Sequence, residues 1–320
     1  MAATLPPVSR NPGGLRPTRR AFLLGLGAAT LVPRVSLAQT TPISVVASTP
    51  VVADLVANVA GDRASVHSVV PTSGDPHTYE TTPRDLAALS ESKTFIFVGG
   101  FLEAFLETSV WGNALRDAKL PTLRLLDRAD PIVTDTVIDH GDHVHDTRSG
   151  DPHVWLDPLR AMLMIQAIGE HLTVVDQPGA AEYRSRADAY GAAVADLHAE
   201  LDRDLGAIPR ERRRLIVLHD AYRYFAQRYG FEVIGYVVKN PGQEPSAKQL
   251  AELTALIDSA NASVVFKEPQ LNARILEQLA ADRGLRVGDL LTDSFAGRVN
   301  SYLGLMRFNR DSLLQHLANS

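Results

Sequence analysis

The sequence predicts an α/β protein of two similar lobes, each a parallel sheet flanked by helices, with a long rigid helix joining them. From residue 43 onward, short β-branched runs alternate with helical patterns, which is typical of parallel sheets covered on both faces. Two long helical stretches interrupt this alternation, and the alternation then resumes. Candidate metal ligands follow strands in both halves, where parallel sheets place their binding sites. We therefore expect a metal site between the lobes.

The first lobe is predicted to alternate strands with helices as far as residue 126. Pro83 opens one of these helices, because a proline at the first turn loses no intrahelical hydrogen bond. The expected strands are 43–47, 66–70, 94–98 and 123–126, and the expected helices are 51–59, 83–89 and 101–111. A polar stretch without apolar periodicity, from about 129 to 150, is predicted to be an exposed, mobile loop.

Two helical stretches are predicted next, over 158–174 and 180–205. Asp157 is expected to cap the first, and the second is alanine-rich, charged and long enough to act as a stiff connection. Alternation then resumes, with strands expected at 215–218, 233–238, 263–266 and 285–290, and helices at 221–229, 246–258, 273–282 and 302–317. The predicted organisation is a signal peptide at 1–38, an N-terminal lobe at 39–178, a linking helix at 179–205 and a C-terminal lobe at 206–320.

The first 38 residues have the pattern of an export signal. Residues 18–24, which include Arg19 and Arg20, resemble a twin-arginine motif, and the apolar run from Phe22 to Val32 is too short to span a bilayer. The small residues of 36–38 offer a cleavage site. An N-terminal membrane anchor is the alternative. We predict a twin-arginine-type signal peptide and a periplasmic mature protein.

Composition excludes several classes of function. The 320 residues contain no cysteine, so disulfides, thiolate metal sites and cysteine nucleophiles are excluded, and no cysteine is available for lipidation. Residues 1–38 hold five arginines and no acid, so their removal would move the net charge from −5 to −10. An acidic protein of this kind is a poor candidate for binding nucleic acid.

Four residues far apart in the sequence stand where a predicted strand or turn meets the next element. They are His77, His153, His219 and Asp293. Each alone is more commonly a hydrogen-bonded loop residue or a helix cap. Together, three imidazoles and one carboxylate make a full tetrahedral ligand set for a cation such as Zn²⁺.

A second histidine cluster lies in the polar loop. His140, His143 and His145 fall within six residues of one another, and such a cluster can bind Zn²⁺ weakly once the loop is ordered. A solvated acidic loop is the alternative interpretation. We predict a loop that collects or transfers zinc.

Several motifs, in order, resemble one protein family over nearly all of the chain after residue 38. They are Asp75-Pro76-His77-Thr78-Tyr79-Glu80, Gly99-Gly100-Phe101-Leu102-Glu103, Asp151-Pro152-His153-Val154-Trp155, His219-Asp220-Ala221-Tyr222, Glu244-Pro245-Ser246, Phe266-Lys267-Glu268-Pro269-Gln270 and Asp293. The chain closely resembles the metal-binding solute-binding proteins of ABC importers, and within them the zinc-uptake (ZnuA-type) branch.

The resemblance implies that His77, His153, His219 and Asp293 hold a transported Zn²⁺ ion. Similar manganese and iron proteins usually carry a carboxylate where His219 stands, and an imidazole there favours Zn²⁺ over Mn²⁺. The implied partner is an ABC permease in the inner membrane. A periplasmic zinc metallochaperone is a further candidate partner, and we expect a monomer.

Three alternatives stay open at this point. The first is a manganese or iron solute-binding protein of the same family. The second is a zinc-dependent hydrolase, although such a site keeps an open coordination position beside a general base, and no HExxH pattern is present. The third is an adhesin that a metal stabilises. Among these, we expect a transport protein and no enzyme.

Overall fold

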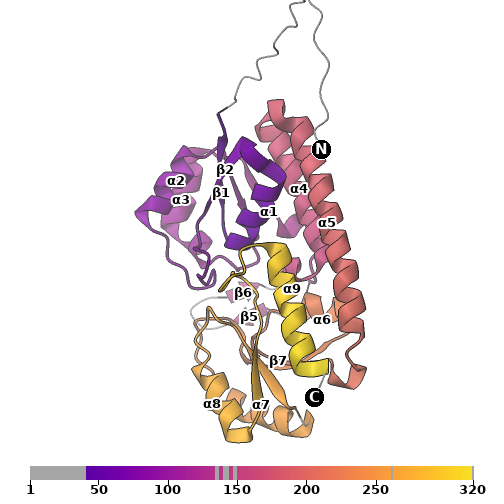
Figure 1. Ribbon diagram of the computed structural model, residues 1–320. Helices are drawn as coiled ribbons and strands as arrows, with labels where there is room; N and C mark the ends of the chain where they lie inside the picture. The colour runs from indigo at the N-terminus through magenta and orange to yellow at the C-terminus, as the bar shows by residue number, and fades with distance from the viewer. Residues whose placement is uncertain (1–40, 134–136, 140–143, 147–149, 261, 319–320) are drawn as a thin grey trace, which may run out of the picture. The chain divides into compact units, whose positions relative to one another are not determined.

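A computed structural model describes residues 41–133, 137–139, 144–146, 150–260 and 262–318 (Figure 1). The chain divides into residues 1–39 and residues 40–320, and all described elements belong to the second unit. The signal peptide predicted at 1–38 therefore lies outside the described residues. Among the helices that the structure describes, none is both long enough and apolar enough to cross a membrane.

The first sheet consists of four parallel strands in the order β2-β1-β3-β4. The strands are β1 (Ile43–Ala47), β2 (Ala64–Ser68), β3 (Thr94–Phe97) and β4 (Thr122–Arg124). On β1, Val45 lies opposite Val66 of β2 and Thr94 of β3. The central strand is β-branched and buried, as expected for a strand covered on both faces.

The second sheet has the order β10-β9-β7-β8 and is also parallel. Its strands are β7 (Arg214–His219), β8 (Glu232–Val238), β9 (Val264–Lys267) and β10 (Arg286–Asp289). When the strands of each sheet are numbered in chain order, both sheets have the same arrangement. The first strand lies between the second and the third, and the fourth lies beside the third. The prediction of two similar parallel-sheet lobes is confirmed.

Helices cover both sheets and connect them. They are α1 (Pro50–Ala60), α2 (Pro83–Glu91), α3 (Ser109–Ala118), α4 (Pro158–Val175), α5 (Ala180–Gly206), α6 (Arg223–Tyr229), α7 (Ala247–Ala260), α8 (Arg274–Arg283) and α9 (Tyr302–Leu313). Short 3₁₀ turns occur at Gly61–Arg63, Ala104–Glu107, Leu126–Arg128, Val154–Leu156, Gln177–Gly179 and Arg210–Arg212, and a π-helical turn at Leu314–Ala318 ends α9.

Alternating strand residues enter different cores. In β1, Val45 faces a core that is shared by the two lobes, whereas Val46 faces a smaller core beneath α2 and α3. In β7, Val217 faces the shared core and Ile216 faces a core beneath α7 and α8. The period of two along each strand therefore separates one continuous core from two local ones.

Helix α5 borders the shared core along its length (Figure 1). It packs against α4 and α1 beside the first sheet, and against α9 and α6 beside the second. Its buried residues include Tyr183 near one end and Leu205 near the other. The predicted long central helix is confirmed, while the lobe boundaries at residues 178 and 205 stay predictions.

The helix predicted at 101–111 is wrong. Gly99, Gly100 and Phe101 all have positive φ, and the next helix, α3, begins only at Ser109. Thr108 caps α3 by accepting a hydrogen bond from the backbone N–H of Trp111. A Cβ at Gly100 would lie 3.1 Å from the carbonyl oxygen of Gly150, so the absence of a side chain at Gly100 lets the two loops approach each other.

The segment predicted as an irregular loop at about 129–150 contains a short antiparallel pair. Its strands are β5 (Val137–Asp139) and β6 (Val144–Asp146). Three residues are too few for a period of two to be recognised in the sequence. His140 and His143 lie outside the described residues, and His145 is part of β6.

Asp157 joins the start of α4 to α6 of the second lobe. Its carboxylate caps α4 through the N–H of Leu159, as predicted, and accepts hydrogen bonds from Arg160 Nη1 at 2.7 Å. Arg228 of α6 donates to both carboxylate oxygens, from Nε at 2.8 Å and from Nη2 at 2.7 Å. The pair is bidentate and Asp157 is buried, so this interaction is stronger than a surface ion pair.

We expect Asp157→Ala to lower the free energy of unfolding by about 2–4 kcal/mol, because it removes a helix cap and leaves two guanidinium groups without their carboxylate. Denaturant titration measures this change. Asp127→Ala is the matched control, since Asp127 is exposed and pairs with Arg124 at 3.4 Å. The control should stay within about 0.5 kcal/mol of the wild type. Equal effects of the two substitutions would contradict the prediction.

Candidate metal centre

The four predicted ligands come from four separate segments. His219 is the last residue of β7, and Asp293 follows β10 in the same sheet. His77 lies in the loop between β2 and α2, and His153 immediately precedes the 3₁₀ turn Val154–Leu156. Strands in both sheets therefore lead to the site through their carboxyl ends, as the parallel topology predicts.

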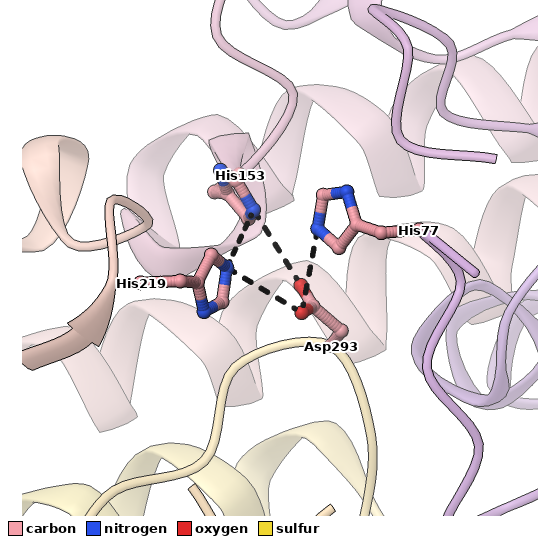
Figure 2. A group of neighbouring side chains, drawn as sticks. All are labelled: His77, His153, His219 and Asp293. Carbon is pink, nitrogen blue, oxygen red and sulfur yellow. Dashed lines mark hydrogen bonds and ion pairs between the residues drawn. The ribbon is translucent and has the colours of Figure 1, made fainter. Parts of the chain in front are cut away.

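The structure brings all four side chains together (Figure 2). One ligand atom from each lies within 4.8 Å of the ligand atoms of the others. His219 Nε2 and His153 Nε2 are 3.3 Å apart. Asp293 Oδ2 lies 3.7 Å from His77 Nε2 and 3.7 Å from His219 Nε2, and Asp293 Oδ1 lies 3.6 Å from His153 Nε2.

These separations match the donor spacing around a small divalent ion. Ligands at the corners of a tetrahedron lie about 1.6 times the metal–ligand distance apart, which is roughly 3.3 Å for a Zn–N distance of ~2.0–2.1 Å. His153, His219 and Asp293 are buried, and the side chain of His77 is only 6% exposed. The group therefore has the donors, the spacing and the enclosure of a metal site, and its role as ligand set stays a prediction.

Two carboxylates orient two of the imidazoles. Asp151 Oδ1 lies 2.8 Å from His153 Nδ1, and Glu268 Oε1 lies 2.7 Å from His219 Nδ1. A carboxylate can only accept, so each Nδ1 carries a proton and each Nε2 faces the centre, where its lone pair is available once that nitrogen is unprotonated. Outer carboxylates of this kind fix the tautomer and the ring orientation of metal-binding histidines.

Burial and neighbouring charges shift the pKa values of two of the four side chains. Burial alone would lower the pKa of His219, but the neighbouring Glu268 carboxylate, with a smaller contribution from Asp293, raises it to about 9. Burial raises the pKa of Asp293 to about 6, although the positive charges of His153 and His219 oppose this shift. The raised pKa favours a protonated His219, and a metal ion that bound at Nε2 would have to displace that proton.

The backbone around Asp293 is held from three sides. Trp155 Nε1 donates to the carbonyl oxygen of Thr292 at 3.0 Å, and the Ser294 hydroxyl donates to the carbonyl oxygen of Gly74. Asn309 of α9 donates to the carbonyl oxygen of Leu291 and accepts from its N–H, both at 2.8 Å. Asp293 is consequently positioned by protein contacts that need no ion.

The loop that carries His77 is held by its own side chains and by the second lobe. Asp75 accepts from the N–H of His77 at 3.0 Å and from the hydroxyl of Thr78 at 2.7 Å. Gly242, in the loop after β8, has φ +82°, and a Cβ there would lie 2.5 Å from Thr78 Cγ2. The two loops thus meet closely beside the site.

No sequence pattern alone indicated a role for Asp151, Glu268 or Thr292, which surround the four candidate ligands. Glu268 and Asp151 were part of the motifs that carried the family resemblance, and that was the only available signal. Of the predicted transfer loop, His140 and His143 lie outside the described residues, and no side chain is described for His145. Within the described ranges, no second group of histidines and acids is placed to hold a metal ion.

Comparison with known proteins identifies the family. The family described as "Zinc-uptake complex component A periplasmic" matches residues 45–316. A relative from Halalkalibacterium halodurans, the manganese-binding lipoprotein MntA, is 27% identical over 280 residues, which cover 86% of this chain and 89% of that protein. The iron ABC transporter substrate-binding lipoprotein MtsA of Streptococcus pyogenes serotype M1 is 25% identical, over 88% of this chain and 91% of that protein.

Among solved structures, the periplasmic zinc-binding protein TroA from Treponema pallidum is similar, with a TM-score of 0.75 and 26% identity. The similarity covers 87% of this chain and all of that one. A zinc-bound deletion mutant of ZnuA has a TM-score of 0.70 and 27% identity, over 87% of this chain and 99% of that one. The chain therefore belongs to the zinc-uptake component A family, the periplasmic metal-binding solute-binding proteins of ABC importers, which are transport proteins and not enzymes.

Proposed function

We propose that this chain captures Zn²⁺ and delivers it to an ABC permease, with His77, His153, His219 and Asp293 as the ligands. The observation that carries the proposal is the convergence of three imidazoles and one carboxylate, whose ligand atoms all lie within 4.8 Å of one another, with Asp293 3.6 to 3.7 Å from each histidine and His153 3.3 Å from His219. Nitrogen-rich sites of four ligands suit Zn²⁺, whereas Mn²⁺ prefers oxygen donors and higher coordination.

The alternative cargo is manganese or iron. The names of the relatives from Halalkalibacterium halodurans and Streptococcus pyogenes refer to these metals, while the names of the two structural relatives refer to zinc. A carboxylate at position 219 would replace a nitrogen donor by an oxygen donor and would therefore favour Mn²⁺. The imidazole at this position supports zinc.

We propose further that the chain is exported through a twin-arginine-type signal peptide. The names of several relatives describe lipoproteins. The present sequence contains no cysteine that could carry a lipid, and it has Arg19-Arg20 before an apolar run. These features support a protein that is released into the periplasm, where it meets the permease and, as a candidate donor, a zinc metallochaperone.

Metal analysis tests the choice of ion. Protein purified without added metal should retain one Zn²⁺ per chain, and Zn²⁺ should displace Mn²⁺ in competition. His219→Glu should shift the preference toward Mn²⁺ and weaken Zn²⁺ binding by more than about tenfold, because a borderline nitrogen donor becomes a hard oxygen donor. His67→Gln is the control, since His67 pairs with Asp85 and is not one of the four candidate ligands. Preferential binding of Mn²⁺ by the wild type would overturn the zinc assignment.

Zinc affinity should fall as pH falls. His219 must lose a proton to coordinate, and its pKa is raised to about 9, so binding at neutral pH should release about one proton. The dissociation constant should rise about tenfold per pH unit between pH 8 and 6.5, and more steeply near the Asp293 pKa of about 6. Chelator competition across pH, together with calorimetry in buffers of different ionisation enthalpy, measures both effects. An affinity that is constant between pH 6 and 8 would contradict them.

We also propose that His140, His143 and His145 form a transfer loop. Deletion of residues 139–146 should leave the affinity of the main site within about twofold of the wild type, because none of its four ligands lies there. The deletion should slow zinc uptake from a donor and remove weak additional sites. Stopped-flow transfer and total metal stoichiometry measure this. Unchanged transfer and stoichiometry would favour a solvated loop without a metal role.

A further inference from the structure

Glu268 lies between the two ligands of the second sheet. It follows β9 directly, and β9 lies between β7, which ends at His219, and β10, which precedes Asp293. The side chain is 1% exposed. A carboxylate so deeply buried needs several donors to compensate for its lost hydration.

The two oxygens of Glu268 have different partners. Oε1 accepts from Nδ1 of His219 at 2.7 Å. Oε2 accepts from the hydroxyl of Thr292 and from Nε2 of Gln270, the latter at 3.3 Å. The Thr292 hydroxyl also lies 3.1 Å from Asp293 Oδ2. Glu268 therefore contacts one ligand directly and reaches the other through a single hydroxyl.

The Thr292 hydroxyl is held in place from more than one direction. Gln270 Nε2 donates to Thr292 Oγ1 at 3.2 Å, so the hydroxyl oxygen accepts one bond while its proton faces two carboxylates. Thr292 is fully buried. These contacts leave the Asp293 side chain little freedom to turn away from His219.

We propose that Glu268 is a positioning residue that holds His219 and Asp293 as one preassembled half of the site, with Thr292 transmitting its effect to Asp293. Asp151 is the informative contrast. It orients His153 through Nδ1, but no described contact joins it to Asp293 or Thr292. Glu268 should thus be coupled to a second ligand, and Asp151 should not. This inference rests on the proposed metal-binding function.

A double-mutant cycle on Zn²⁺ affinity tests the coupling. Glu268→Ala should weaken Zn²⁺ binding by about 10- to 100-fold, as is common when an outer partner of a metal ligand is removed. Thr292→Val should weaken it less, and Thr292→Ser should restore binding. The combined loss in the Glu268→Ala, Thr292→Val protein should be at least about threefold smaller than the product of the single losses, because the second change finds the link already broken.

The control cycle pairs Asp151→Asn with Thr292→Val. Its two losses should multiply independently, since these residues do not contact each other. If the Glu268 cycle is also independent, or if Glu268→Ala binds Zn²⁺ as tightly as the wild type, the proposal is wrong. Should Glu268→Ala fail to fold, Glu268→Gln keeps the volume of the side chain and removes its charge. It should weaken binding in the same direction, and unchanged affinity in that variant would equally overturn the proposal.

A second readout needs no metal. The Nδ1–H proton of His219 should give a low-field ¹H NMR resonance in the metal-free wild type that disappears in Glu268→Ala and persists in Asp151→Asn. If the wild type binds neither Zn²⁺ nor Mn²⁺, the proposed function fails, and this resonance alone decides the role of Glu268. Its persistence in Glu268→Ala would contradict the positioning role.

Discussion

The carboxylate of Asp293 is buried among three imidazoles, and it can stay there only if positive charge accompanies it. Burial raises its pKa, while the charges of His153 and His219 lower it, so the metal-free site is a compromise between desolvation and attraction. The proton on His219 supplies part of the required charge. A divalent ion would replace that proton with a larger charge at the same place, which links metal capture to proton release.

The fold brings the four side chains together through two sheets of the same topology. In each, the first strand has the second strand on one side and the third on the other, so connections leave in opposite directions and a crevice forms at the carboxyl ends. His219 ends the first strand of the second sheet. The sequence predicted this arrangement because strand–helix alternation and ligand-type residues after strands are both local patterns. These patterns gave the fold and several candidate residues, and the motifs of the family resemblance selected His77, His153, His219 and Asp293 among them.

The contacts around the ligands could not be predicted in the same way. His219 and Glu268 are 49 residues apart, and only the pairing of β7 with β9 brings them together. The helix expected at 101–111 failed for a different reason. Its apolar residues fit a helical period, but Gly99-Gly100 begins a left-handed turn, and Thr108 is the true cap. The two glycines and the capping residue Thr108 are better indicators of where this helix begins than the spacing of its apolar residues.

The fold itself does not select the metal. Relatives whose names refer to manganese, iron and zinc share 25–27% identity with this chain over most of its length. Selectivity must therefore reside in a few side chains and in how rigidly they are held. In the proposed site, a nitrogen donor at position 219 would favour zinc only if its ring cannot rotate away, so the donor type and its anchoring would act together.

Rigid anchoring also lowers the free-energy cost of binding a metal ion. Asp157 with Arg228, Trp155 with Thr292, and Ser294 with Gly74 connect segments around the site without any ion. Folding has already ordered these segments, so a metal ion need not supply the free energy to do so. A larger share of the free energy of interaction between the ion and the four donors would then contribute to affinity and to discrimination between ions. A flexible site with the same donors would bind more weakly and would adapt more readily to the wrong metal.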